Sequence, residues 1–400
     1  MTRHYSIPFG TPIYCSTFIN TEIIALGAGG GTSKSGIKNT ITIIKLNDTE
    51  EEEKKKTHYQ LEKGEDVPMS ILFDRSNNQL ICGINSPQLT THPEKNLHLR
   101  TFLWDKQNQL IKPKTAQRIL TYDSEDNYQR ITSLSEKTPK LLAIGGTNNQ
   151  LNLLNYPSLK PAFSPMWCDQ DDKTLELLAV DFHSNGTQFL VASNRNIKLY
   201  STKRTSPPKQ NKLPSPDLIR QLEPPTPHAN QSCAFRNAMY GRGTNCKTLY
   251  TILNYLPNKK KKHTPSIWGP AADPRKAVLM TWNLDNGTPG RSKTISHKPV
   301  TCLDMSPSGH LLAFSSSDLS IGILDASSLR SLLSILHAHE FPVTSIKFSP
   351  DEKRVVSCSA DMTIRVVELH AGIRDRSYKY MLMLISLIML LVGLLIKFLN

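Results

Sequence analysis

The chain has 400 residues, of which 38% are hydrophobic and 20% charged, so it can bury a core and is not wholly disordered. Its 48 Lys and Arg residues outnumber its 34 Asp and Glu residues, and the net charge of +14 predicts an acidic partner: a membrane surface, a protein or nucleic acid. The 7 cysteines are scattered without a CxxC pair, which argues against a zinc site and against a secreted disulfide framework.

Short apolar runs recur along the chain in a common frame. Two segments that begin at Val300 and Val343 align without gaps, and each holds three strand-like runs separated by turns. A period of about 40–45 residues with four strands per unit is typical of WD-repeat propellers. Weaker copies precede these two, so that seven units start near residues 10, 67, 131, 177, 231, 300 and 343. The sequence predicts an all-β fold, a seven-bladed WD40-type β-propeller over residues 1–371.

The first unit contains a glycine-rich connection, residues 27–39, between two strand-like segments. It is not a P-loop, because Ser33 rather than glycine precedes Lys34, and it lacks the third glycine of a dinucleotide fingerprint. Both motifs also need a following helix, whereas residues 41–46 read as a strand. Glycines leave backbone carbonyls unobstructed, so such a loop can direct carbonyl oxygens at a monovalent cation. The alternative is an ordinary surface hairpin.

A Pro-rich stretch interrupts the repeats at about residues 203–230, and it predicts an extended excursion from the propeller. Two strand-like segments near Leu249 and Leu279 then restore a blade around a basic run at residues 259–262. The alternative is a shorter propeller with an independent domain at residues 205–295.

The last segment predicts a membrane anchor. Residues 380–396 carry no charge, and apolar residues follow Lys397, so a single transmembrane helix is expected over residues 380–399 after a basic juxtamembrane segment, residues 372–379. The uncharged run would span about 25 Å, which suits the thinner bilayer of the endoplasmic reticulum. The basic residues before it mark that side as cytosolic. A buried C-terminal helix is the alternative, although the run offers only Ser386 for a polar face.

The loop sequence GGGTSKSGIKN, the divergent propeller and the short C-terminal span together resemble the family of endoplasmic-reticulum guanine-nucleotide exchange factors for the small GTPase that starts COPII coats. The resemblance implies that the loop binds a potassium ion through backbone carbonyls and presses on the GTPase to expel GDP, without covalent chemistry. It assigns the metal positions to Gly29, Gly30, Gly31, Thr32 and Gly36. It assigns the exchange site to Ile37, Lys38, Asn39 and Asp66, with Glu65 as an alternative acidic residue. It assigns partner contacts to Lys34, Ser35, Ile37 and Asn39.

The resemblance also implies partners and a location. These are the GTPase, the endoplasmic-reticulum membrane and further COPII coat components, with the propeller on the cytosolic side of a single span. Nucleic-acid binding is not expected, because no aromatic residues are interleaved with the basic run. A hydrolase is disfavoured, because the chain lacks GxSxG and HExxH, and His339 stands where propellers carry a structural histidine. The alternative function is a non-catalytic, membrane-tethered scaffold, which would bind proteins regardless of residues 29–39.

Overall fold

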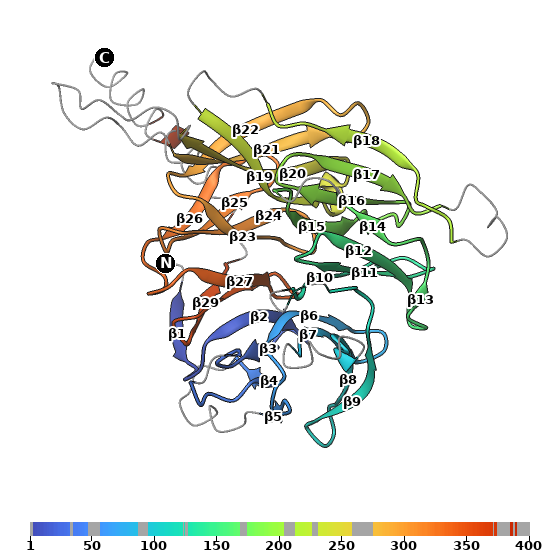
Figure 1. Ribbon diagram of the computed structural model, residues 1–400. Helices are drawn as coiled ribbons and strands as arrows, with labels where there is room; N and C mark the ends of the chain where they lie inside the picture. The colour runs from blue at the N-terminus through green and yellow to red at the C-terminus, as the bar shows by residue number, and fades with distance from the viewer. Residues whose placement is uncertain are drawn as a thin grey trace, which may run out of the picture.

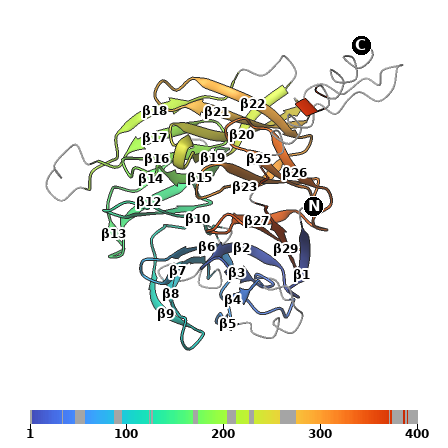
Figure 2. The same cartoon turned by 180° about the vertical axis from the view of Figure 1, so that it is seen from behind.

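The computed structural model contains seven antiparallel β-sheets arranged around a common centre (Figures 1 and 2). It describes residues 3–32, 35–46, 57–86, 95–122, 124, 127–168, 174–203, 213–225, 231–257, 275–370, 372–373, 385–386 and 389. Each sheet has four strands, except that the third has a fifth. The predicted seven-bladed propeller is confirmed. The shorter propeller with a separate domain at residues 205–295 is wrong, because that region supplies an ordinary fifth blade.

Every blade runs from an innermost strand to an outer strand. The innermost strands are β2 (Ile13–Phe18), β6 (Pro68–Asp74), β10 (Gln129–Leu134), β15 (Leu177–Phe182), β19 (Gln231–Tyr240), β23 (Val300–Met305) and β27 (Val343–Phe348). The second strands are β3 (Ile23–Ala28), β7 (Gln79–Ile84), β11 (Leu141–Gly146), β16 (Gln188–Ser193), β20 (Thr248–Pro257), β24 (Leu311–Ser316) and β28 (Arg354–Ser359). The innermost strands begin close to the unit starts read from the sequence.

The outer half of each blade is more exposed than the inner half. The third strands are β4 (Thr40–Lys45), β8 (Leu99–Asp105), β12 (Gln150–Asn155), β17 (Ile197–Ser201), β21 (Lys276–Asn283), β25 (Ile321–Asp325) and β29 (Thr363–Glu368). The outer strands are β5 (Thr57–Gln60), β9 (Leu110–Gln117), β13 (Lys160–Pro161), β18 (Leu218–Leu222), β22 (Pro289–Ser296), β26 (Ser331–Ile335) and β1 (His4–Pro8). Strand β14 (Met166–Trp167) also pairs with β12, and a short 3-10 helix, η4 (Gly243–Asn245), joins β19 to β20. Within the predicted excursion, residues 218–222 form the outer strand of the fourth blade.

The ring is closed by both ends of the repeat array. Each innermost strand contacts the next, and β27 contacts β2, so the first and seventh blades are neighbours. The seventh blade takes its outer strand from the N-terminus: β1 pairs antiparallel with β29, with His4 opposite Val367 and Pro8 opposite Thr363. Closure leaves neither end of the array with an exposed interface between blades.

Apolar side chains fill the interfaces between blades, and a polar network fixes the seventh. Burial of Ile and Leu side chains there contributes about 1.5–3 kcal/mol each. His339 is buried, and its Nδ1 lies 3.0 Å from Asp361 Oδ2 while its Nε2 lies 2.8 Å from Ser357 Oγ. This network confirms the structural role expected for His339.

All seven innermost strands carry a β-bulge, at the second residue of six strands and at the sixth residue of the longer β19. The extra residues are Tyr14, Met69, Arg130, Leu178, Arg236, Thr301 and Thr344. A bulge leaves one residue out of the ladder and redirects its side chain. These bulges lie toward the face at which the innermost strands begin, here called the loop face.

The predicted membrane span lies almost entirely outside the described residues. Among those that are described, no helix has both the length and the apolar character needed to cross a bilayer. The anchor at residues 380–399 stays a prediction.

Candidate functional site

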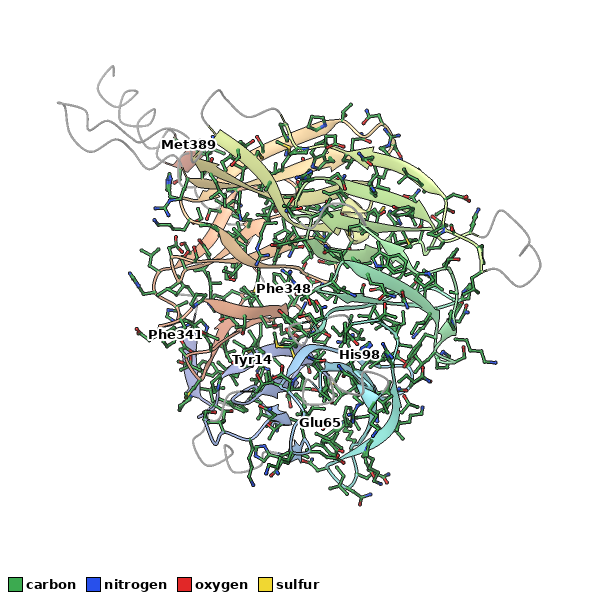
Figure 3. The ribbon with its side chains drawn as sticks, viewed as in Figure 1. Tyr14, Glu65, His98, Phe341, Phe348 and Met389 are labelled. Atoms are coloured by element: carbon green, nitrogen blue, oxygen red, sulfur yellow. The ribbon has the colours of Figure 1, made fainter. Side chains whose placement is uncertain are left out.

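The glycine-rich loop joins the second and third strands of the first blade, β3 and β4, and so lies on the loop face. The segment that connects β5 to β6 also reaches this face, because antiparallel strands bring the outer strand back to the start of the next innermost one. Glu65, labelled in Figure 3, and Asp66 lie at the end of that segment, just before β6. The fold thus brings the predicted acidic residues to the predicted loop, although about thirty positions separate them in the sequence.

Close packing requires glycine at the first two of three consecutive positions at the start of the loop, and a positive φ favours glycine at the third. Gly29 donates its N–H to Pro12 O at 3.0 Å, and a Cβ there would overlap Asn39 Oδ1. A Cβ at Gly30 would overlap Ser35 Oγ. Gly31 has φ +68°, a conformation that L-residues with side chains rarely adopt. The loop therefore folds back on itself at these positions.

Asn39 holds the two ends of the loop together. Its Oδ1 accepts the Gly31 N–H at 2.9 Å, and its Nδ2 donates to Gly31 O at 2.9 Å and to Glu65 O at 2.8 Å. The Asn39 carbonyl also accepts the Leu61 N–H at 2.9 Å. One amide side chain thus cross-links the loop to the segment before the second blade. These contacts make Asn39 a residue that fixes the loop.

The far side of the loop presents exposed polar and half-buried apolar groups. Thr32, Ser35, Gly36 and Lys38 are exposed, and Gly36 has φ +77° with open space around it. Ile37 is half-buried, and its Cβ lies 3.1 Å from the position that a Cβ on Gly30 would take.

Lys34, one of the predicted partner contacts, lies outside the described residues. The described part of the loop presents exposed polar groups around one half-buried aliphatic side chain, Ile37.

Asp66 and Glu65 point to different partners. Asp66 Oδ1 lies 3.4 Å from the Cβ position of Gly31 and accepts the Val67 N–H at 2.7 Å, while the Asp66 N–H donates to Asn85 O at 2.8 Å. Burial raises the pKa of Asp66 above its usual range, and the Val67 N–H offsets this only in part. The Asp66 carboxylate therefore faces the glycines of the loop.

Glu65 instead forms an ion pair with Arg100 on β8, a residue that the sequence gave no reason to select. Glu65 Oε2 also accepts the Glu62 N–H at 2.9 Å. Because Asn39 binds the Glu65 carbonyl, the ion pair braces the base of the loop from the second blade. Only its position opposite the loop in the folded chain marks Arg100 as part of the site.

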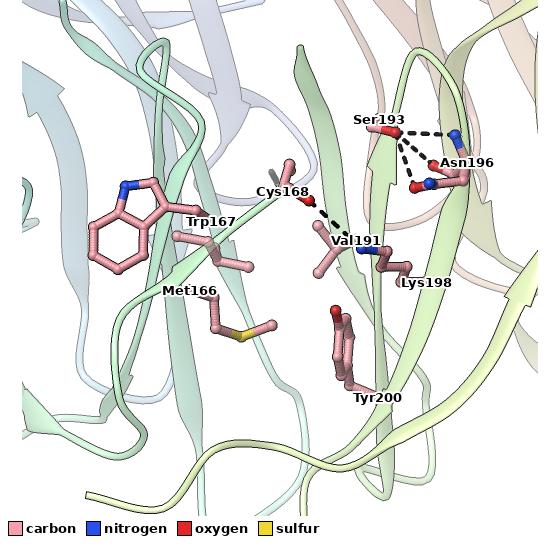
Figure 4. A pocket seen from close by; sticks show the side chains of 9 residues that line it. Met166, Trp167, Cys168, Val191, Ser193, Asn196, Lys198 and Tyr200 are labelled. Atoms are coloured by element: carbon pink, nitrogen blue, oxygen red, sulfur yellow. Dashed lines mark hydrogen bonds between the residues drawn. The ribbon is translucent and has the colours of Figure 1, made fainter. Parts of the chain in front are cut away.

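Two cavities lie away from the loop. One, at the edge between β14 and the fourth blade, has a volume of about 10 Å³, enough for a single water at most (Figure 4). Lys198 Nζ closes it with a contact of 3.5 Å to Cys168 O. The other lies on the axis of the ring, measures about 390 Å³, and is lined by innermost strands, Arg130 and Asp181 among its residues.

The donor atoms that the described part of the loop and its neighbour Asp66 offer are oxygens. In the described part of the chain, no three His, Cys, Asp or Glu side chains come together to hold a metal ion. The oxygen donors are the backbone carbonyls of the loop and the Asp66 carboxylate, whose Oδ1 lies 3.4 Å from the Cβ position of Gly31. Oxygen donors of this kind are the ligands that alkali cations take.

Sequence comparison places WD repeats at the C-terminal end of the propeller. The family described as "WD domain, G-beta repeat" matches residues 290–325 and 330–368, which span β22 to β25 and β26 to β29. Among solved structures, a chain of the mitotic checkpoint complex superposes with a TM-score of 0.60 at 11% identity, over 92% of this chain and 94% of that one. That likeness concerns the fold alone.

Curated relatives are similar over most of the chain. The guanine nucleotide-exchange factor SEC12 of Candida glabrata is 21% identical over 382 residues, 94% of this chain and 73% of the relative. SEC12 of Mus musculus is 24% identical over 250 residues, 60% of this chain and 52% of the relative. The putative exchange factor SED4 of Saccharomyces cerevisiae is 22% identical over 397 residues, 95% of this chain but 33% of the relative. The chain therefore carries WD repeats and is similar, over most of its length, to the SEC12 and SED4 guanine nucleotide-exchange factors.

Proposed function

We propose that the protein is a guanine nucleotide-exchange factor that acts on the small GTPase initiating COPII coats, and that the loop of the first blade is its acting element. The observation that carries this proposal is the amide cross-link of Asn39, which fixes the base of the loop while Ser35, Gly36 and Lys38 stay exposed. The names of the relatives support an exchange factor as the general class.

Exchange needs no acid, base or nucleophile from this chain. The factor must bind the nucleotide-free GTPase more tightly than the loaded one, and linkage then weakens nucleotide binding by the same factor. A ten-thousandfold faster release corresponds to a barrier lower by about 5.5 kcal/mol. A loop that bends under load could not supply this energy. The Asn39 contacts and the ion pair between Glu65 and Arg100 keep the loop in one shape.

Individual side chains then have distinct roles. Ile37 is the apolar group that enters the partner, with Lys38 and Ser35 as flanking polar contacts. Asn39 is a positioning residue, because its side-chain bonds go to this chain rather than outward. Asp66 faces Gly31 and offers a negative charge to the loop.

A potassium ion is the cofactor that we propose for the loop. The backbone carbonyls of Gly29, Gly30, Gly31, Thr32 and Gly36 would hold it, with Asp66 contributing charge. The ion would supply cross-linking of carbonyl oxygens and would offset the cost of a half-buried carboxylate. Hydrogen exchange of the loop amides, measured in potassium buffer and in lithium buffer, tests this without the GTPase. Potassium should slow the exchange, and equal rates in the two buffers would contradict potassium binding by the loop.

The function is tested by release of a fluorescent guanine nucleotide from the COPII-initiating GTPase in the presence of the full chain. Ile37→Asp should lower the accelerated release rate at least tenfold, a loss of about 1.4 kcal/mol of transition-state stabilisation. Ile219→Asp is the matched control, because Ile219 is 46% exposed on the outer strand of the fourth blade. Its release rate should equal that of wild type.

The same assay separates the exchange factor from a membrane-tethered scaffold. A scaffold would leave nucleotide release unaccelerated and would bind its partners equally well with Ile37→Asp.

We further propose that the predicted span at residues 380–399 holds the propeller on the cytosolic face of the endoplasmic reticulum, near coat components. Protease added outside sealed microsomes should then digest the propeller, and protection of the propeller would contradict this orientation.

A further inference from the structure

The loop face carries a group of exposed apolar side chains where the sixth blade leads into the seventh. Leu336 and Phe341 are 74% and 57% exposed, and both lie in the connection from β26 to β27. Met362 is exposed in the turn from β28 to β29. Both connections lie on the loop face, since one follows an outer strand and the other follows a second strand. These three side chains are here called the seventh-blade patch, and Figure 3 labels Phe341.

Hydrogen bonds hold the two connections of the patch against one another. Ser359 Oγ donates to Phe341 O at 2.9 Å, and the Glu340 N–H donates to Asp361 Oδ2 at 2.8 Å. The segment that carries Phe341 therefore lies beside the turn that carries Met362. Exposed apolar residues that are scattered singly are normal, whereas exposed apolar residues that gather in one place mark contact sites.

The patch continues into the glycine-rich loop of the first blade through residues 9–12. The Phe9 N–H donates to Met362 O at 2.8 Å, and the Gly29 N–H donates to Pro12 O at 3.0 Å. The three chain steps from Phe9 to Pro12 span at most about 11 Å. One partner that touches the loop can therefore touch Met362 as well.

The ring itself gains nothing from methionine at position 362. Met362 has φ +68°, a conformation in which asparagine is enriched and methionine is uncommon. The corresponding turn of the third blade has Asn149 there, with φ +66°. In each turn the preceding side chain, Asp361 or Asn148, accepts the backbone N–H two residues later. An exposed apolar side chain on such a backbone indicates a role outside the folding of the ring.

The described ends of the chain leave the ring on the face opposite the patch. Strand β1 begins there and β29 ends there, and the Leu369 N–H donates to Lys353 O at 2.7 Å in the turn from β27 to β28. This direction favours a separate molecule over the ends of this chain as the occupant of the patch. We propose that the seventh-blade patch is a second contact for the small GTPase, which docks an apolar area on it while the glycine-rich loop acts on its nucleotide site.

This inference rests on the proposed exchange function and divides the labour between two surfaces. A contact that is made equally in the ground state and the transition state changes the half-saturating concentration and leaves the maximal rate alone. Phe341→Asp and, separately, Leu336→Asp in the full chain should each raise the GTPase concentration for half-maximal release at least tenfold. The maximal release rate should stay within about twofold of wild type. Ile37→Asp should instead lower the maximal rate.

Two further variants separate a lost contact from a damaged fold. Met362→Asn should weaken binding of the nucleotide-free GTPase in calorimetry, while its Tm equals or exceeds that of wild type, because asparagine accepts the positive φ. Leu110→Asp is the matched control, since Leu110 is 49% exposed at the start of β9 on the opposite face. Its binding and its release kinetics should equal those of wild type.

The outcomes distinguish this inference from the exchange function. If wild type accelerates release and the patch variants bind the GTPase as tightly as wild type does, only the patch is refuted. If wild type binds the GTPase without accelerating release and the patch variants bind it weakly, the docking surface stands and the exchange function falls. If wild type does neither, both fall. Sedimentation of wild type and Phe341→Asp covers the remaining case: a wild-type dimer that becomes monomeric in the variant, with unchanged GTPase binding, would make the patch an interface between copies and overturn the proposal.

Discussion

Asn39 is the residue whose replacement most directly tests how the loop is held. Asn39→Ala deletes three side-chain hydrogen bonds, two with Gly31 and one with the Glu65 carbonyl. At about 0.5–1.5 kcal/mol net for each bond, the loop should lose about 1.5–4.5 kcal/mol of local stability. Because the site is half-exposed and water can replace part of these bonds, we take a value near the lower end, about 2 kcal/mol.

Hydrogen exchange at a single amide should report this loss of local stability more directly than the nucleotide-release rate does. The Gly31 N–H donates to Asn39 Oδ1, so its protection against hydrogen exchange reports the loop directly. A loss of 2 kcal/mol corresponds to roughly thirtyfold faster exchange at this amide, with amides of the seventh blade unchanged. Accelerated nucleotide release should fall at least tenfold in the same variant.

The matched control is Asn245→Ala. Asn245 also uses its amide to join two segments, since its Nδ2 donates to Gly309 O at 2.8 Å, but it lies on the opposite face of the ring. It should cost stability without changing nucleotide release. If Gly31 keeps its protection in Asn39→Ala, or if release is as fast as in wild type, then the amide cross-link does not shape the acting loop.

Three other outcomes follow from the structure. Deleting residues 1–8 removes β1 from the seventh blade and should lower the Tm of the whole ring in one cooperative transition, whereas an unchanged Tm would mean that closure does not depend on this strand. Gly29→Ala should slow nucleotide release more than Gly36→Ala, because a Cβ meets Asn39 at the first position and open space at the second; equal rates would count against the folded-back loop. His98 is buried and neutral, and burial lowers its pKa from 6.5 to about 4, so about 3 kcal/mol of stability present above pH 6.5 should be lost as the pH falls toward 4. Urea unfolding at pH 7 and pH 4.5 should show this loss in wild type and a smaller one in His98→Gln, and equal losses would assign the acid sensitivity to other groups.

The blade count could be predicted because each blade repeats a pattern that the chain displays locally. Apolar runs of five to eight residues with turns between them recur at each unit, and even the divergent fifth blade, β19 to β22, keeps them. Strand β1 could not be assigned in this way. It is a single short strand without neighbours of its own, and its partner β29 lies at the far end of the array. Pairing over such a distance leaves no local signal.

The candidate site was predicted in part. The glycines and Asn39 stand together in the sequence, so the loop could be found from composition. The contributions of Glu65 and Arg100 depend on the third strand of another blade, and no periodicity reveals them. The seven bulges are hidden for a related reason. A bulge is a feature of the backbone, and residues as different as tyrosine and threonine occupy it. No residue type therefore marks its position in the sequence.

The position of the loop in the ring explains how a thin glycine hairpin could act on a partner. A hairpin attached to one blade would bend about its two strands. This loop is also bound sideways, since Asn39 reaches Glu65 and Glu65 is held by Arg100 in the second blade. The closed ring fixes both blades relative to one another, so force on the loop is carried by the contact between β2 and β6 and not by the hairpin alone. On this reasoning Arg100 is a positioning residue of the proposed exchange site, although it lies on a different blade from the loop.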